Sequence, residues 1–219
     1  MTLEQIFATR AGRLKASEIR ELLKLLDDPN ILSFAGGIPD PTLFPSKEFA
    51  KAFAAALEPT HQAQALQYSI SEGYLPLRSW IAGEMARIGV PCSAANILIT
   101  SGSQQALDYL GKLFLSPGDT ALVGWPTYLG ALAAFNAYEP EFDQLSINGN
   151  RAAQDYAKQA EAKGGRVKFA YLSADFSNPT GQTVDQRGRE GLLDLADTLD
   201  CAIIEDESYP ALRSAGAPV

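Results

Sequence analysis

The 219-residue sequence is poor in the residues that most metal sites and catalytic triads require. It contains one histidine, His61, in a polar connection without a serine or aspartate partner, so we expect a surface residue and no triad. Its two cysteines, Cys92 and Cys201, fit neither a CxxC nor a zinc-binding spacing, and we expect both to be reduced, apolar side chains. The sequence therefore predicts no metal site.

Long apolar runs and clusters of positive charge are also missing. No apolar stretch approaches the ~20 residues that span a bilayer, and the first residues lack the basic and apolar regions of a secretion signal. The formal net charge of -8 argues against a nucleic-acid surface, which needs clustered lysine and arginine. We therefore expect a cytoplasmic protein with small-molecule partners, and with neither nucleic acid nor a membrane among them.

The sequence does contain enough apolar residues, 46% of the total, to bury a core. We expect residues 1–72 to form an N-terminal arm and a small-domain segment. Within them one helix follows Ser17, a loop rich in glycine and proline covers residues 34–41, and a second helix begins with Ser46 as its cap. The stripe of apolar residues expected to be buried on that second helix is Phe49, Phe53 and Leu57.

From residue 73 to residue 219, helical patterns alternate with short apolar strands. Strands are expected at residues 97–100, 121–123, 167–172 and 201–204, and helices at residues 75–88, 104–115, 128–135 and 187–199. Such alternation predicts an α/β fold, with a mostly parallel sheet covered by helices on both faces. Ligands of open α/β sheets bind at the carboxyl ends of strands, so polar residues that follow strands are candidates.

Three segments after predicted strands carry such residues. Residues 101–105, Ser-Gly-Ser-Gln-Gln, join a strand to a helix and could form an anion site from the Ser103 hydroxyl and the helix N–H groups, or simply a capped turn. Residues 178–181, Asn-Pro-Thr-Gly, could equally be an ordinary turn. Tyr128 could cover a flat ligand ring or pack into the core. Each feature alone therefore leaves two interpretations open.

Asp206 directly follows the strand expected at residues 201–204. A carboxylate at the edge of a sheet is stabilised by a cationic partner, and a protonated pyridine nitrogen would be such a partner. The alternative is a solvated acidic loop, Glu205-Asp206-Glu207. The order of all four features along the chain carries more information than any one of them.

In this order the features resemble those of fold-type I pyridoxal phosphate (PLP) enzymes, aminotransferase class I/II, over nearly the whole chain. Three stretches are most similar to the branch with 2-aminoadipate and kynurenine aminotransferases: residues 33–40 (SFAGGIPD), 66–69 (LQYS) and 101–108 (SGSQQALD). The resemblance implies the fold-type I transferase fold and PLP as cofactor. It also implies transfer of an amino group from an amino acid to a 2-oxo acid, with 2-oxoglutarate as the expected acceptor.

By the same resemblance, four residues would contact the PLP ring. Tyr128 would stack on the ring, and Asn178 and Tyr209 would hydrogen-bond its phenolic oxygen. Asp206 would keep the ring nitrogen protonated. Because protonated PLP acts as an electron sink, Asp206 and Tyr128 are the catalytic residues expected in this chain.

Four further residues would contact the cofactor phosphate or the substrate. Ser103 and Gln104 would bind the phosphate of PLP. Tyr68 would reach the phosphate of the cofactor in the neighbouring subunit, which implies a homodimer. Gly37 would lie beside the bound amino acid.

Two alternatives would use many of the same residues. Some bacterial transcription regulators carry an aminotransferase-like, ligand-sensing domain behind a winged helix-turn-helix. We find no basic DNA-reading helix ahead of the arm, which favours the enzyme. A PLP lyase on the same fold would share all of these residues, and only its products would separate it from a transaminase.

One residue that the family uses is missing from the sequence. Catalysis in the family requires a lysine that forms a Schiff base with PLP, and no lysine follows Lys168. Lys168 itself is expected at the start of a strand, at the end opposite the proposed pocket. The arginine that clamps the substrate carboxylate in the C-terminal half of the family is absent as well. We therefore expect residues 73–219 to be an incomplete PLP-binding large domain, a fragment that is inactive alone.

We predict that the 219-residue chain supplied with PLP catalyses no transamination, because it has neither the anchoring amine nor the carboxylate clamp. The measurement is glutamate formation from 2-oxoglutarate and a panel of amino acids. Free PLP at the same concentration is the control. Glutamate formed clearly faster with the protein than with free PLP would contradict this prediction.

Overall fold

A computed structural model describes residues 3–13, 37, 39–147 and 149–216. The chain divides into two compact units: one is Ala16–Thr100, and the other combines Met1–Lys15 with Ser101–Val219. The boundary expected after residue 72 stays a prediction. The helix expected after Ser17 lies outside the described residues, as does most of the loop at residues 34–41.

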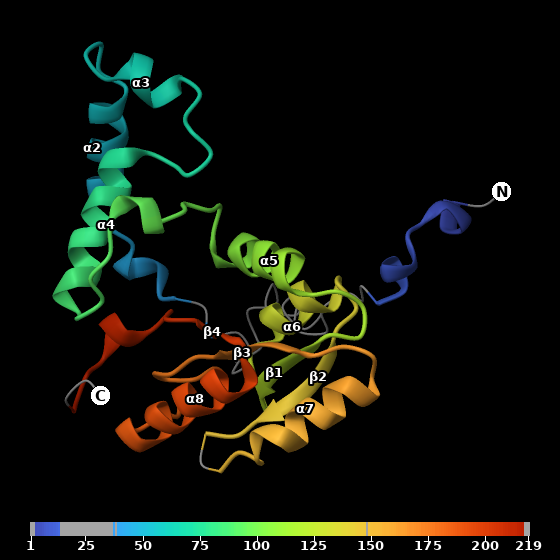
Figure 1. The fold of residues 1–219 in the computed structure, drawn as a ribbon. Helices are drawn as coiled ribbons and strands as arrows, with labels where there is room; N and C mark the ends of the chain where they lie inside the picture. Colours follow the sequence, from blue (N-terminus) through green and yellow to red (C-terminus); the bar gives the residue numbers. More distant parts are fainter. Residues whose placement is uncertain (1–2, 14–36, 38, 148, 217–219) are drawn as a thin grey trace, which may run out of the picture. The chain divides into compact units, whose positions relative to one another are not determined.

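The larger unit is built on a four-stranded parallel sheet with the order β2-β1-β3-β4 (Figure 1). Its strands are β1 (Thr120–Gly124), β2 (Glu141–Leu145), β3 (Val167–Leu172) and β4 (Ala202–Glu205). The predicted α/β fold is confirmed, and β1, β3 and β4 lie within one residue of their predicted bounds. β2 was not expected, because three of the five residues in its sequence, EFDQL, are polar and leave no apolar run.

Two helices cover each face of this sheet (Figure 1). α5 (Ser103–Phe114) and α6 (Leu129–Asn136) pack on one face, and α7 (Ala153–Ala162) and α8 (Gln186–Leu199) pack on the other. The alternation of β1 divides the core accordingly: Ala121 and Val123 join the α5 and α6 side, whereas Leu122 joins the α7 and α8 side. α5, α6 and α8 were predicted to within one residue, and α7 was not.

A β-bulge at the start of β3 sets the position of Lys168. Thr120 pairs with Val167 and Ala121 with Phe169, so Lys168 is the extra residue. Its ammonium nitrogen lies 3.4 Å from the carboxylate of Asp119, just before β1. Lys168 therefore sits at the amino end of the strands, opposite the edge where the candidate residues were expected.

The smaller unit contains α2 (Ser46–Ala56), α3 (Gln62–Leu66) and α4 (Leu75–Arg87). Buried Arg78 of α4 donates to the carbonyl oxygens of Gly73 at 3.1 Å and Ala94 at 2.9 Å, which ties the start of the helix to the segment after it. Gly73 has φ +101°, and a Cβ there would lie 2.6 Å from the Ile99 side chain, so only glycine fits. Short 3-10 helices across both units are η1 (Leu3–Ile6), η2 (Thr9–Arg13), η4 (Pro41–Leu43), η5 (Ala94–Asn96) and η6 (Pro210–Leu212).

Two predictions about α2 were wrong. Pro45 occupies the cap position, and Ser46 is the first helical residue. The expected buried stripe is exposed, with Phe49 at 59%, Phe53 at 68% and Leu57 at 51% of full exposure. The physical reason is that the described part of this unit buries only Arg78 and Ala82, which provides no apolar layer for α2 to cover.

The strand predicted at residues 97–100 does not form in the described part of the chain. Ile97 has extended backbone angles, with φ -116° and ψ 127°. Ile99 donates its N–H to the carbonyl of Glu72 at 2.9 Å, but no strand lies alongside to complete a ladder. An extended segment with apolar residues is therefore predicted as a strand from the sequence although it pairs with no other strand.

Among the described helices, none is both long and apolar enough to cross a membrane.

Candidate functional site

The strand order creates a crevice at the carboxyl ends of β1 and β3. β1 leads to α6 on one face of the sheet and β3 leads to α8 on the other, so the two connections leave the edge in opposite directions (Figure 1). Open α/β sheets bind their ligands at such a reversal. A cavity of about 160 Å³ opens here, and its lining includes Thr127 after β1 and Ser177 and Thr180 after β3.

Asp206 is held at this edge by three hydrogen bonds. Its N–H donates to the carbonyl of Leu172 at 2.9 Å, which extends the pairing of β3 and β4. The Tyr171 hydroxyl donates to carboxylate oxygen Oδ2 at 2.8 Å, and the Ser208 hydroxyl donates to Oδ1 at 2.9 Å. The half-buried carboxylate is thus fixed by neighbouring groups and is not a solvated loop residue.

Tyr171, which the sequence analysis did not single out, lies fully buried beneath Asp206. Its ring meets that of Phe135 edge-on, with centroids 5.6 Å apart. Burial, and secondly the bond to Asp206, raises the pKa of the Tyr171 phenol well above its usual range. The alternation of β3 does place Tyr171 on a buried face, and a buried tyrosine hydroxyl needs a partner, but sequence alone does not say which one.

Tyr128 and Gln104 come together at the start of α6. The Tyr128 ring lies against Gly130, where a Cβ would fall 2.4 Å from ring atom Cζ. Gln104 of α5 donates through Nε2 to the carbonyl of Gly130 at 2.8 Å. Tyr128 also lies close enough to Tyr171 to influence its pKa. Two of the predicted residues therefore both contact Gly130, close to the tyrosine that holds Asp206.

α5 begins at Ser103 in a way that suits an anion. Gly102 precedes it with φ +86°, and no side chain caps this helix start within the described residues. The Ser101 N–H is satisfied by Oε1 of Gln105 at 2.7 Å. The Gln105 N–H donates to the carbonyl of Gly102 at 3.2 Å. The exposed Ser103 hydroxyl and the N–H groups of Ser103 and Gln104 remain for a negatively charged ligand.

Asn178 lies in the loop after β3, which is closed by its own backbone. Ser177 donates its N–H to the carbonyl of Gln182 at 2.8 Å, and Gly181 donates to Ser177 at 2.6 Å. Tyr209 begins η6, shortly after Asp206. Within the described residues, the side chains of Asn178 and Tyr209 make no hydrogen bonds, so both can serve a ligand.

The other two predicted residues, Tyr68 and Gly37, belong to the smaller unit, and their roles stay predictions. Tyr68 is 98% exposed. Gly37 has φ +54°, a left-handed conformation that favours glycine.

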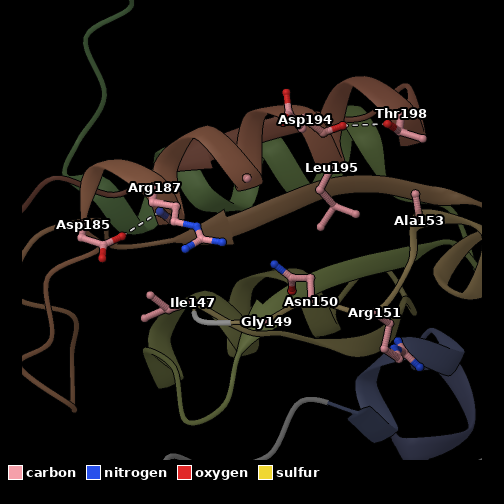
Figure 2. A pocket seen from close by; sticks show the side chains of 12 residues that line it. Ile147, Gly149, Asn150, Arg151, Ala153, Asp185, Arg187, Asp194, Leu195 and Thr198 are labelled. Atoms are coloured by element: carbon pink, nitrogen blue, oxygen red, sulfur yellow. Dashed lines mark hydrogen bonds between the residues drawn. The ribbon is translucent and has the colours of Figure 1, made fainter.

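A second, larger cavity of about 710 Å³ lies away from these residues, between α8 and the connection before α7 (Figure 2). Asn150 and Arg151 line one side, and Asp185 and Arg187 line the other. None of the predicted site residues lines this cavity or the smaller one of about 160 Å³. The polar contacts around Asp206 and Gly130, and not a cavity volume, therefore identify the candidate site.

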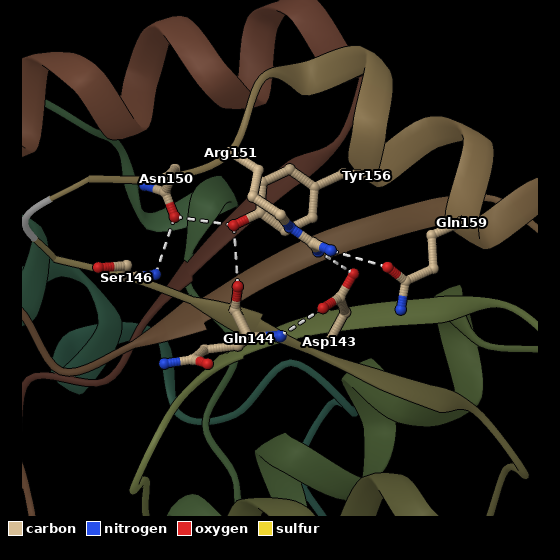
Figure 3. Close-up of polar contacts among 7 residues, drawn as sticks. All are labelled: Asp143, Gln144, Ser146, Asn150, Arg151, Tyr156 and Gln159. Atoms are coloured by element: carbon tan, nitrogen blue, oxygen red, sulfur yellow. Dashed lines mark hydrogen bonds and ion pairs between the residues drawn. The ribbon is translucent and has the colours of Figure 1, made fainter.

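Polar contacts order one wall of the larger cavity (Figure 3). The Tyr156 hydroxyl lies 2.8 Å from the carbonyl of Gln144 and 3.0 Å from Oδ1 of Asn150, and donates to one of them at a time. The Arg151 guanidinium lies 4.2 Å from the centre of the Tyr156 ring and also pairs with Asp143. These contacts anchor the connection from β2 to α7.

Comparison with known proteins identifies the family of the chain. Residues 30–217 match the model of the family Aminotransferase class I and II. The chain belongs to this family. The aromatic-amino-acid aminotransferase 1 of Thermococcus litoralis is 43% identical over 221 residues, which cover 99% of this chain and 53% of that protein. The 2-aminoadipate transaminase of Thermus thermophilus is 42% identical over 213 residues, 97% of this chain and 52% of that protein.

A solved structure of the family shows the same fold. It is that of Pyrococcus horikoshii kynurenine aminotransferase in complex with PMP, kynurenine and its product, with a TM-score of 0.86 and 39% identity. The match covers 99% of this chain and 54% of that one. The chain thus spans about half the length of the aminotransferases that it matches.

In this aminotransferase-family chain, an ion-pair network joins the two loops that carry the candidate residues. Asp175, in the loop of Asn178, lies 3.2 Å from Arg189 of α8 and 2.7 Å from Arg213, which follows Tyr209. Arg189 also reaches Glu205 at 3.6 Å. Burial, and secondly the charge of Glu207, raises the pKa of Glu205, and Arg189 opposes that rise.

We predict that Asp175→Asn lowers the free energy of unfolding by about 2 kcal/mol, because it leaves two partly buried arginines without their shared anion. Urea denaturation measures the change. The matched control is Glu141→Gln, which removes an exposed ion pair with Lys163 and should cost well under ~1 kcal/mol. Equal small losses in both variants would show that the network contributes little.

Proposed function

We propose that these residues form the cofactor-holding part of a PLP-dependent aminotransferase that transfers an amino group from an amino acid to a 2-oxo acid. The observation that carries this proposal is the Asp206 carboxylate, fixed by the Tyr171 and Ser208 hydroxyls at the reversal of the strand order. Support also comes from relatives that are named for amino-group transfer, which favours a transferase over the lyase and ligand-sensing alternatives.

The donor set of the site fits the parts of PLP. A flat aromatic ring, an acidic partner for the ring nitrogen, two hydrogen-bonding side chains for the phenolic oxygen and a helix start for the phosphate are all present. The residues in these roles would be, in turn, Tyr128; Asp206; Asn178 and Tyr209; and Ser103 with Gln104. All of them lie in the larger unit.

PLP, when bound, supplies an electron sink for the carbon that loses a proton. The protein's part is to hold the ring and its proton. Asp206 would keep a proton on the ring nitrogen, because a fixed carboxylate stabilises the cationic form. Tyr128 would cover one face of the ring and exclude water from it, while Asn178 and Tyr209 would set its orientation.

The expected substrates follow from the relatives. Their names refer to aromatic amino acids, 2-aminoadipate and kynurenine, so we propose an amino-acid donor with a large side chain and 2-oxoglutarate as the acceptor. Lys168, the last lysine in the sequence, pairs with Asp119 at the opposite end of the sheet and does not face the site. Turnover therefore requires a lysine from outside these residues.

A chimera tests the proposal. The chain replaces the matching part of the Thermus thermophilus relative, whose remaining part is kept. We predict that the chimera transaminates, and that Asp206→Asn lowers kcat by about 100-fold because the ring nitrogen loses its anionic partner. Absorbance shows that the cofactor is still bound.

The matched control for this test is Asp194→Asn, which changes an exposed carboxylate on α8 and should leave kcat unchanged. An Asp206→Asn variant with undiminished kcat would remove Asp206 from the mechanism. A chimera that holds PLP without transferring amino groups would argue against the proposed function itself.

We also propose a homodimer in which Tyr68 reaches the partner subunit's cofactor, and test it by mixing chimeric subunits that carry Tyr68→Phe or Asp206→Asn. One site of the mixed dimer would then combine both intact residues and the other both defects. We predict that the mixture regains activity relative to either variant alone, measured after reassembly. Two equally impaired sites in the mixed dimer would mean that Tyr68 acts within its own subunit.

A further inference from the structure

We propose that Tyr171 is the positioning residue for Asp206: its buried phenol holds one carboxylate oxygen and fixes the orientation in which Asp206 meets the ring nitrogen of the cofactor. This inference rests on the proposed function. It adds a residue that does not itself contact the ligand. Its support is the hydrogen bond of 2.8 Å from the Tyr171 hydroxyl to Oδ2 of Asp206.

The Tyr171 hydroxyl has a fixed position because the whole side chain is immobilised. Tyr171 is 0% exposed. Its ring packs edge-on against Phe135, which in turn lies 5.0 Å from Phe169, measured between ring centroids. A side chain in such a close-packed interior keeps a single rotamer. The donor that Asp206 meets is therefore part of the rigid core.

The other donor to the carboxylate is not fixed in this way. Ser208 is exposed, lies in the loop after β4, and its hydroxyl turns about a single bond. The backbone of Asp206 is tied to Leu172, the neighbour of Tyr171 on β3. Both rigid attachments of Asp206 therefore come from the end of β3, and together they fix the side chain relative to that strand.

Tyr171 also keeps its proton. Burial is the main cause that raises the pKa of its phenol, the bond to Asp206 and the proximity of Tyr128 add to it, and a hydrogen bond with Ser173 opposes it. The phenol thus remains a neutral donor. A neutral donor orders the carboxylate without cancelling its charge, so the anion stays available to a cationic ring nitrogen.

The first test uses the chain without cofactor. Its eight tyrosines are labelled with 3-fluorotyrosine, and the ¹⁹F signal lost in Tyr171→Phe identifies Tyr171. In Asp206→Asn the ¹⁹F chemical shift of Tyr171 should change, because the anionic acceptor of its phenol hydrogen bond is replaced by a neutral amide. An unchanged Tyr171 signal would overturn the contact, and with it the proposal.

The second test compares the affinity for PLP with that for 1-deaza-PLP, which has a carbon in place of the ring nitrogen. The unmodified chain should prefer PLP. Tyr171→Phe should reduce this preference by about tenfold, since it acts only through the group that meets the nitrogen. A merely structural effect would weaken the binding of both ligands equally and leave the ratio unchanged, which would overturn the proposal.

The matched control is Tyr156→Phe, which also removes the hydroxyl of a fully buried tyrosine, here one bonded to the chain before α7 (Figure 3). It should leave the ratio unchanged. The outcomes separate the two proposals. A chain that binds neither ligand, or that binds both equally well before mutation, contradicts the proposed function. A preference for PLP that survives Tyr171→Phe contradicts only the role of Tyr171.

Discussion

The candidate site depends on one topological constraint, the reversal of the connections at β1 and β3. Because β1 leads to α6 on one face and β3 to α8 on the other, the chain cannot close over the carboxyl ends of these two strands. The space left between the connections collects the residues that follow each strand, Tyr128 and Asn178. β4, paired with β3, adds Asp206 at the same edge.

The core and the site are continuous through β3. Phe169 and Tyr171 belong to the apolar cluster under α5 and α6. The hydroxyl of Tyr171 lies at the border of this cluster and donates the hydrogen bond that holds Asp206. The bulge at Lys168 gives Phe169 and Tyr171 this face, since it shifts the alternation after Val167. The bulge at the start of β3 thus determines which face Tyr171 lies on, and Tyr171 in turn determines the position of the Asp206 carboxylate beside the end of β3.

The sequence predicts best those elements whose own residues form an apolar run, as in β3 (VKFAYL) and β4 (AIIE). β3, VKFAYL, is buried at five of its six positions and was predicted with its bounds. The edge strand β2 and the helix α7, which buries only Tyr156 and Ala160, leave a weaker pattern and were missed. The strand at residues 97–100 and the buried stripe on α2 were predicted but did not form. Apolar residues favour strand pairing or burial, but a neighbouring strand or an apolar layer must be supplied by another part of the fold.

For the site, the sequence indicates which residues follow the strands but not how their charges are compensated. Four acidic residues stand near this edge, and one of them, Glu207, is exposed. Asp175 is neutralised by Arg189 and Arg213, and Glu205 faces Arg189. Asp206, in the described part of the chain, receives only neutral hydroxyl donors. A carboxylate already paired with arginine gains little from a cationic ligand, whereas one ordered by neutral donors keeps its charge for that ligand. This difference in partners, more than burial or position, supports the proposal that Asp206 is the carboxylate for a protonated ring.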